Sequence, residues 1–486
     1  MQVSLVLRVL ALALCAVSVV AVDASSARRL AGGNAACGGA RVRKPWSKLT
    51  PQEQATYVEA LDLAIQDGVV NDFAAIHLES LGEKQAHSSC AFFTWHRRML
   101  LAFESYLRDR GDKFACLTLP YYDVHTAYVA QSTMRCGSMF ECSPIFAAIG
   151  GPSTQQRVAA LFNGQEAFGF LHSGAPFAKN CDDKNQVCGG IVRADLSQVQ
   201  VPSGAGFGSF VAAVVNSKDY ATFLQEIQHG LHNDVHNALS GAMATFASPR
   251  DVFFYSWHAA IDMFLSVFHL CHIGAPMTPA QLQSSLLAFA DATQTCGGAD
   301  GVGSGSSIIM NVVLNGKLVD VAKHPKLGRY FAHVGDKMWN YGDTRQLGDY
   351  SYSYELPEMM VTQILNNKDI CKGVTAPTTN APTPVPTTNA PTPQTPRHAG
   401  LLVVNETLAA SAGNGTMQPS VATSGSYWQW AQTTYDGLKQ RFGGDMKLVA
   451  EQLRVIECLT FQRVFGVAEY SDAFVKNFHL VSKRPA

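Results

Sequence analysis

The sequence has few charged residues and no cluster of basic ones. Only 15% of its 486 residues are charged, and 37 Lys and Arg nearly balance 38 Asp and Glu. Because binding to a nucleic-acid backbone needs clustered cations, this composition argues against nucleic acid as a partner. With 47% apolar residues, the scarcity of charge does not indicate global disorder.

Long apolar runs are also missing. The uncharged run from Val9 to Val22 follows Arg8 and is too short to span a bilayer, but it suits the core of a secretory signal. We therefore expect residues 1–24 to be a signal peptide, cut after Ala24 or Ala21. The mature chain should then have no membrane span and be secreted.

Export would place the cysteines in an oxidising compartment. Without Cys15, eleven of the twelve cysteines remain, and ten of these precede residue 372. They could form five disulfides, with two local pairs as natural candidates, Cys136/Cys142 and Cys181/Cys188. Cys458 is left over, either free or paired with another molecule.

A Thr/Pro-rich stretch divides the chain. Residues 374–396 contain seven Pro and eight Thr without any charge, and PTTNAPTP begins at both 377 and 386. Such a segment favours extended polyproline conformation, so residues 373–397 are expected to be a linker. It would join a large domain, residues 25–372, to a C-terminal extension, residues 398–486. The Thr/Pro composition and the N-x-Thr sites at Asn405 and Asn414 predict a glycoprotein.

The large domain carries mostly helical signals. Thr50-Pro51-Gln52-Glu53 is a capping box that should open a helix ending at Gly68. Further helices are expected at 71–81 ending at Gly82, from Ser89 to Gly111, from Ser217 to Gln228, and after a second capping box at 248–251. One hairpin is expected around Asn315-Gly316. We predict a mainly α fold, an antiparallel four-helix bundle with a small hairpin or sheet and long loops.

The histidines form two triplets. His232 and His236 lie one helical turn apart, and His258 follows near the start of the next strong helix. Upstream, His77, His87 and His96 are spaced by ten and nine residues. Two sets of three imidazoles on separate helices are what a pair of metal ions inside a bundle would need.

The ligand type limits the metal. Six imidazoles without a carboxylate suit copper or zinc, and copper has the higher affinity at nitrogen sites. A zinc protease would need Glu directly after the first His of the H-x-x-x-H pair, where Asn233 stands. Spacing alone cannot separate the pair His232/His236 from His229/His232, and a single histidine is more often a core or surface residue.

Two segments resemble the copper motifs of the tyrosinase family. HSSCAFFTWHRRMLLAFESYL resembles the first motif, and LHNDVH followed by HAAID resembles the second. LPYYD, the Ser-Pro-Arg-Asp turn with Phe254, and Tyr350-Ser351-Tyr352 resemble flanking features of the family. The resemblance covers residues 38–358, which makes residues 25–372 a tyrosinase-like catalytic domain.

The resemblance implies a dinuclear copper centre. One copper would be bound by His77, His87 and His96, and the other by His232, His236 and His258. In the family this centre uses O2 to convert small monophenols and o-diphenols to o-quinones. A catechol oxidase without monophenolase activity is an alternative, and a haemocyanin-like O2-binding protein is a weaker one.

Further roles follow from the same resemblance. Asn233 and a preceding carboxylate, best matched by Glu226, would hold a water that takes the phenol proton. Phe254 would lie beside the last ligand. Asp262 would either orient His258 or be a solvated helix residue. In family members a C-terminal extension often covers the copper site until it is cleaved, and residues 398–486 could do the same or form an interaction module.

Overall fold

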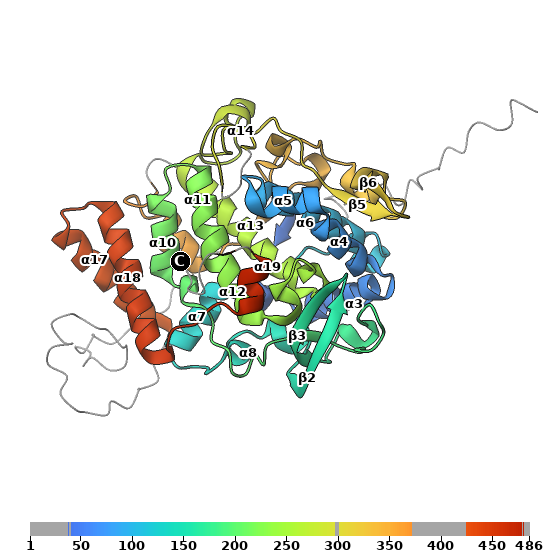
Figure 1. Ribbon diagram of the computed structural model, residues 1–486. Coiled ribbons are helices and arrows are strands. Elements are labelled where there is room, and N and C mark those ends of the chain that lie inside the picture. Colours follow the sequence, from blue (N-terminus) through green and yellow to red (C-terminus); the bar gives the residue numbers. More distant parts are fainter. Residues whose placement is uncertain (1–36, 38–39, 297–300, 372–423, 479, 481–486) are drawn as a thin grey trace, which may run out of the picture.

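The computed structural model describes residues 37, 40–296, 301–371, 424–478 and 480 (Figure 1). The expected signal peptide, the Thr/Pro-rich linker and both N-glycosylation sites lie outside these residues. The descriptions below therefore concern the large domain and the helical part of the C-terminal extension.

The fold is mainly helical, as the sequence predicts. The longer helices of the large domain are α3 (Pro51–Gln66), α4 (Val69–Leu78), α5 (Ser80–Ser88), α6 (Phe92–Arg108), α7 (Val124–Ser132), α10 (Phe207–Asn216), α11 (Tyr220–Ile227), α12 (Asn233–Leu239) and α13 (Phe253–His272). Short ones are α8 (Met139–Cys142), α9 (Ile145–Ala148), α14 (Pro279–Ser284) and α15 (Gly328–Phe331). The extension contributes α17 (Ser424–Arg441), α18 (Met446–Phe465) and α19 (Asp472–Asn477).

Some predicted helix ends are confirmed and others are wrong. The capping box at Thr50 is present, and α3 ends before Gly68. In contrast, Gly82 lies inside α5 and the helix break falls at Glu79. Asp219, not Ser217, caps α11. The second capping box does not form, because Asp251 binds the buried guanidinium of Arg193 at 2.6 and 2.7 Å.

The strands form three small sheets. The expected hairpin is confirmed as β5 (Asn311–Leu314) and β6 (Lys317–Asp320), and both turn residues have positive φ. A hairpin that the sequence analysis missed, β2 (Ser153–Phe162) with β3 (Gln165–His172), continues into β4 (Ile191–Arg193). Strand β1 (Arg41–Arg43) pairs in parallel with β7 (Tyr352–Tyr354), which brings the start of the large domain against its end.

The large domain is held together by one extended apolar core and five disulfides. The two predicted local pairs, Cys136–Cys142 and Cys181–Cys188, are confirmed. Cys37–Cys116, Cys90–Cys296 and Cys271–Cys371 close longer loops. Cys458 is the free cysteine of the described chain.

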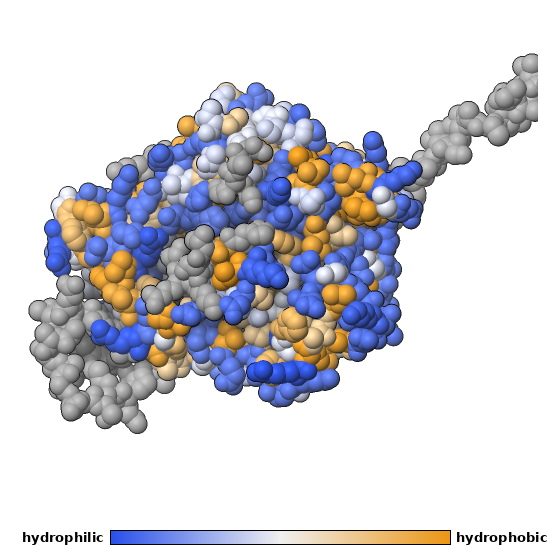
Figure 2. All heavy atoms as spheres, viewed as in Figure 1, coloured by the Kyte–Doolittle hydropathy of each residue, from blue (hydrophilic) through white to orange (hydrophobic). Residues whose placement is uncertain are grey.

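The surface mixes polar and apolar residues in the view of Figure 2, with apolar ones gathered over the β5–β6 hairpin. There, Val313 and Leu318 are more than half exposed. None of the helices in the described ranges has both the length and the apolar character needed to cross a bilayer.

Candidate metal centre

Five helices and one irregular turn bring the six predicted histidines together. His77 lies on α4, His87 on α5 and His96 on α6, while His236 lies on α12 and His258 on α13. His232 ends a π-helical turn, Gln228–His232, that links α11 to α12. Within each triplet the nitrogen atoms able to bind a metal lie within 4.8 Å of one another.

The backbone fixes the orientation of the imidazole rings. Nδ1 lies 2.7 Å from a carbonyl oxygen in three of them, His77 (Phe246 O), His96 (Phe92 O) and His236 (Met243 O). The same contacts are 3.2 Å long for His87 (Glu83 O) and His232 (Gln228 O). A carbonyl only accepts hydrogen bonds, so Nδ1 must carry the proton. In a neutral ring this leaves Nε2 with a free lone pair, which is the ligand form of histidine.

The Nε2 atoms of neighbouring ligands face one another, and Nδ1 of His258, unlike that of the other five, is buried without a hydrogen-bond partner. His77 and His96 approach to 3.4 Å through Nε2, and so do His236 and His258. The Nε2 of His232 is buried without any hydrogen-bond partner. Two ligands on one metal at about 2.0–2.1 Å and a near-tetrahedral angle lie roughly 3.3 Å apart, so the donors fit a metal ion.

Burial keeps these rings neutral. It lowers the pKa of His77, His96, His232 and His258 well below the usual range for histidine, and neighbouring imidazoles add to the effect. The pKa of His236 falls to about 4, again mainly through burial. These five ligands are therefore ready to bind a cation without first losing a proton at neutral pH.

Phe254 and two stacked imidazoles join the two triplets. The rings of His96 and His258 stack at a centroid distance of 4.2 Å and an interplanar angle of 14°. Phe254 lies 4.2 Å from His258 and 5.2 Å from His77 between ring centroids, so it contacts both triplets, as the sequence reasoning expected of its place beside the last ligand. These ring contacts pack the two triplets against each other.

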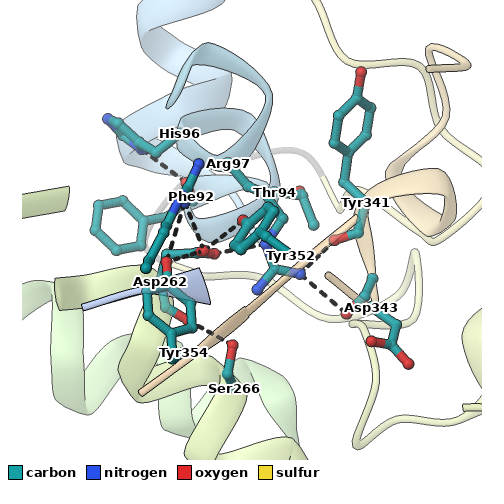
Figure 3. A network of polar contacts seen from close by, with 12 residues as sticks. Phe92, Thr94, His96, Arg97, Asp262, Ser266, Tyr341, Asp343, Tyr352 and Tyr354 are labelled. Atoms are coloured by element: carbon teal, nitrogen blue, oxygen red, sulfur yellow. Dashed lines mark hydrogen bonds and ion pairs between the residues drawn. The ribbon is translucent and has the colours of Figure 1, made fainter. Parts of the chain in front are cut away.

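Asp262 has a different role from either one expected. Its carboxylate accepts hydrogen bonds from Arg97 Nε at 2.5 Å, Tyr352 OH at 2.6 Å and Tyr354 OH at 2.5 Å (Figure 3). Arg43 lies 3.4 Å away. The expectation that Asp262 orients His258 is wrong, because its carboxylate binds the two arginines and the two tyrosine hydroxyls. The alternative, a solvated residue, is wrong too, because Asp262 is only 3% exposed. The Arg97–Asp262 pair instead ties α6 to α13, one residue after His96 and one turn after His258.

Glu226 is not at the metal centre. Its carboxylate accepts a hydrogen bond of 2.9 Å from Arg454 of α18, and its side chain is 37% exposed. Asn233 is buried, and its Oδ1 lies 3.0 Å from Nδ1 of His232. The structure therefore does not bring Glu226 and Asn233 together to hold a water. Asn233 instead orients a ligand.

One loop of the centre could not be predicted from the sequence. Met243 and Phe246, whose carbonyls hold His236 and His77, belong to a single segment that begins with the 3-10 turn Gly241–Ala244. One loop thus orients a ligand in each triplet. Nothing in the residue types of this loop could have indicated the role, because it is performed by backbone oxygens.

The family model for the common central domain of tyrosinase matches residues 67–270, which include all six histidines. Residues 67–270 thus match the tyrosinase family. A pair of copper ions, which the family implies, fits the two triplets of imidazole ligands described above.

The relatives are distant. A tyrosinase of Streptomyces glaucescens is 29% identical over 251 residues, which cover 49% of this chain and 86% of that protein. A tyrosinase-like protein of Diaporthe leptostromiformis is 24% identical over 246 residues, covering 46% of this chain and 61% of its own length. A polyphenol oxidase structure from Thermothelomyces thermophila aligns with 17% identity and a TM-score of 0.39, over 66% of this chain and 90% of that one. The family assignment rests on the central domain and the curated relatives.

Proposed function

We propose that this tyrosinase-family protein is a phenol oxidase that uses O2 to convert small monophenols and o-diphenols to o-quinones. The observation that carries the proposal is the pair of histidine triplets, in each of which the nitrogen atoms able to bind a metal lie within 4.8 Å of one another. Copper bound there would supply the reversible electron transfer between phenol and O2.

The residues of the chain would prepare this chemistry. Backbone carbonyls hold the imidazoles with Nε2 turned inward. The stacked rings of His96 and His258 and the ring of Phe254 are buried and would hold the two triplets side by side. The Arg97–Asp262 pair fixes the distance between the helices that carry His96 and His258. A rigid, dry pocket lets an aromatic ring approach without a competing hydration shell.

A catechol oxidase is the second candidate, and Glu226 favours it. A monophenol has a pKa near 10, so its oxidation benefits from a base that takes the hydroxyl proton. The carboxylate expected to help, Glu226, is paired with Arg454 at the surface of α11. An o-diphenol depends less on such a base, and we infer that diphenols are the better substrates.

We also infer that the C-terminal extension covers the centre. The ring centroid of Phe478 lies 6.4 Å from that of His87, 5.8 Å from that of His236 and 5.1 Å from that of Phe246. Asn237, next to His236, binds the extension through both ends of its amide, to Glu469 O at 3.2 Å and Ser471 N at 2.9 Å. A substrate ring would have to displace Phe478.

Two further contacts support this cover. Tyr470 donates a hydrogen bond of 2.8 Å to Asp234, and Asn477 donates one of 2.8 Å to Ala244 O. Ala244 lies in the loop that orients His77 and His236. The five disulfides support the related inference that the protein works outside the reducing cytosol.

The test measures oxidation of tyrosine and of L-DOPA by the purified, copper-loaded protein and by its Phe478→Ala variant. We expect Phe478→Ala to oxidise L-DOPA faster than the wild type, while the exposed Val467→Ala control does not. Oxidation of neither substrate by either form would contradict the phenol oxidase proposal. Oxidation of L-DOPA alone would select the catechol oxidase.

A second variant addresses the proton acceptor. If Glu226 served the monophenol reaction, Glu226→Gln would lower tyrosine oxidation and spare L-DOPA oxidation. Because Glu226 pairs with Arg454 instead, we expect the ratio of the two rates to stay within about twofold, well under the factor of 10²–10⁴ typical of a general base.

A further inference from the structure

The two histidine triplets are connected to each other ligand by ligand. Two pairs are joined by contacts described above, His77 with His236 through one loop and His96 with His258 through stacked rings. One ligand of each triplet remains, His87 in the first and His232 in the second. These two are joined by Gln228, which contacts the first through its side chain and the second through its backbone.

The side chain of Gln228 holds the end of the helix that carries His87. Gln228 follows the last residue of α11 and is 3% exposed. Its Nε2 donates a hydrogen bond of 2.6 Å to the carbonyl oxygen of His87. That carbonyl belongs to the last turn of α5, where helix carbonyls have no partner within the helix. Oε1 of Gln228 is buried without a hydrogen-bond partner among the described residues, so the bond to His87 is what orients the amide.

The backbone of Gln228 contacts the other ligand. Its carbonyl oxygen lies 3.2 Å from Nδ1 of His232, which also lies 3.0 Å from Oδ1 of Asn233. This contact spans the π turn, in which Gly230 has non-helical angles. The position of Gln228 therefore determines both where α5 ends and how the imidazole of His232 is turned.

The two ligands that Gln228 joins are held less closely by carbonyl oxygens than three of the others. Nδ1 lies 3.2 Å from its carbonyl in both His87 and His232, compared with 2.7 Å in the three closer contacts. His87 is also 7% exposed in its side chain. Because their own contacts are longer, the placement of these two rings depends more on the bond from Gln228.

A second bond attaches α11 to the same corner of the fold. Tyr220, the first residue of α11, donates its hydroxyl to Cys90 O at 3.1 Å. Cys90 lies between α5 and α6 and is bonded to Cys296. The segment that ends with Gln228 is thus attached at both of its ends to the corner that follows His87. A displacement of this corner would be transmitted to the π turn.

We propose that Gln228 is a positioning residue that couples the two metal positions. Binding of an ion by the triplet of His87 would fix the end of α5 and, through Gln228, the π turn that carries His232. Binding of the second ion then meets a ligand that is already ordered, and by linkage the coupling acts in both directions. The inference shares the two metal positions with the proposed function, but it does not need the oxidation of phenols.

The test titrates the metal-free full chain with Co²⁺ and follows the visible absorption of the bound ion. The titration gives the dissociation constants of the first and the second ion, and the ratio of second to first measures the coupling. Repulsion between the two cations is common to all variants, so it cancels when their ratios are compared.

Two variants remove the bond and one serves as the matched control. Gln228→Met has nearly the same size and no donor, and Gln228→Asn keeps the amide but is one methylene too short to reach His87 O. The control is Gln131→Met. Gln131 is also fully buried, and its amide bonds Val201 N at 2.8 Å and Val201 O at 3.3 Å, away from the histidines.

We expect the ratio of the second to the first dissociation constant to rise at least fivefold in both Gln228 variants, which is the lower end of typical coupling between sites. In Gln131→Met it should change less than twofold, although the melting temperature of the metal-free protein falls there too. A role in stability alone would lower the melting temperature without changing the ratio. An unchanged ratio in the Gln228 variants, or an equal rise in Gln131→Met, overturns the inference.

The outcome is distinguishable from failure of the proposed function. If the ratio responds to Gln228 as expected but the copper-loaded wild type does not oxidise L-DOPA, the proposed function fails and the coupling stands. If L-DOPA is oxidised but the ratio does not respond, the inference alone fails. A wild type that binds fewer than two Co²⁺ ions would contradict both.

Discussion

Replacing Asp262 by asparagine removes the one negative charge between Arg97 and Tyr352, with little change in size. In the wild type this carboxylate binds the Arg97 guanidinium at 2.5 Å and accepts two tyrosine hydroxyls, all in a region closed to water. Arg43 would keep its bond of 2.9 Å to Glu104, but Arg97 would be left with neutral acceptors only, the carbonyls of Tyr341 and Gly342 and the asparagine amide. The variant therefore carries a buried cation without its counter-ion.

The expected cost follows from this geometry. Removing one partner of a buried ion pair typically costs about 3–5 kcal/mol, because the other charge stays desolvated. The amide of asparagine can still accept one hydrogen bond, so we expect a loss near the lower end, roughly 3 kcal/mol. The pair also joins the helices that bear His96 and His258, so copper binding should weaken in the same variant.

The assay is urea unfolding of the copper-free protein, followed by far-UV circular dichroism, with copper content measured separately by metal analysis. The exposed Asp436→Asn change on α17 is the matched control, and it should alter the free energy of unfolding by less than about 0.5 kcal/mol. If Asp262→Asn unfolds within about 1 kcal/mol of the wild type, and still holds two copper ions, the reasoning about this ion pair is refuted.

Three other changes test the contacts of α18 with the large domain and one disulfide of the large domain. Glu457 of α18 accepts a hydrogen bond from Gly208 N of α10 at 2.6 Å. Burial raises the pKa of Glu457 to about 7 in the docked extension, so its contribution to docking is complete below the ordinary value of 4.5 and is lost as the pH rises through 7. After a cut in the linker, binding of the C-terminal extension to the large domain should weaken by roughly 1–2 kcal/mol between pH 6 and 8.5. Glu457→Gln should remove this pH dependence. Gly208→Ala should weaken retention by roughly 1–3 kcal/mol through the clash with Arg454 N, measured by size exclusion. Joint replacement of Cys90 and Cys296 by alanine opens a loop of sequence separation 206 and should lower the free energy of unfolding by roughly 3–5 kcal/mol in urea.

Matched controls exist for the last two changes. Gly437 lies within α17 with nothing near its missing Cβ, so Gly437→Ala should not weaken retention. The Cys136–Cys142 disulfide has a sequence separation of only 6, so its removal should cost less than that of Cys90–Cys296. A pH dependence that survives Glu457→Gln, a harmless Gly208→Ala, or the reverse order of the disulfides would each contradict the argument behind it.

The histidine triplets could be predicted because their signal is local. His232 and His236 are one turn apart on a real helix, and the flanking residues supply the rest of the resemblance. The same approach was wrong about Glu226. The π turn at Gln228–His232, with non-helical angles at Gly230, breaks the helix between Glu226 and Asn233, so counting residues no longer tells which way a side chain points.

Partners distant in sequence explain the remaining differences. Asp262 is bound by residues 165 and 90 positions away, and Glu226 by one 228 positions away. No local pattern contains such pairs. The missed β2–β3 hairpin is a different case, because its signal is local: its turn residues Asn163 and Gly164 both have positive φ and are as good a hairpin signal as Asn315-Gly316.

The loop that holds His236 through Met243 O and His77 through Phe246 O has a consequence for the order of maturation. Copper ions would hold this loop through those two imidazoles, and the extension holds it through the bond from Asn477 to Ala244 O. Whichever event comes first bears the entropy cost of ordering the loop, and the second then meets it already ordered. Metal insertion and closure of the extension are thus thermodynamically linked, and a chain that has taken up its copper is the one that closes most firmly.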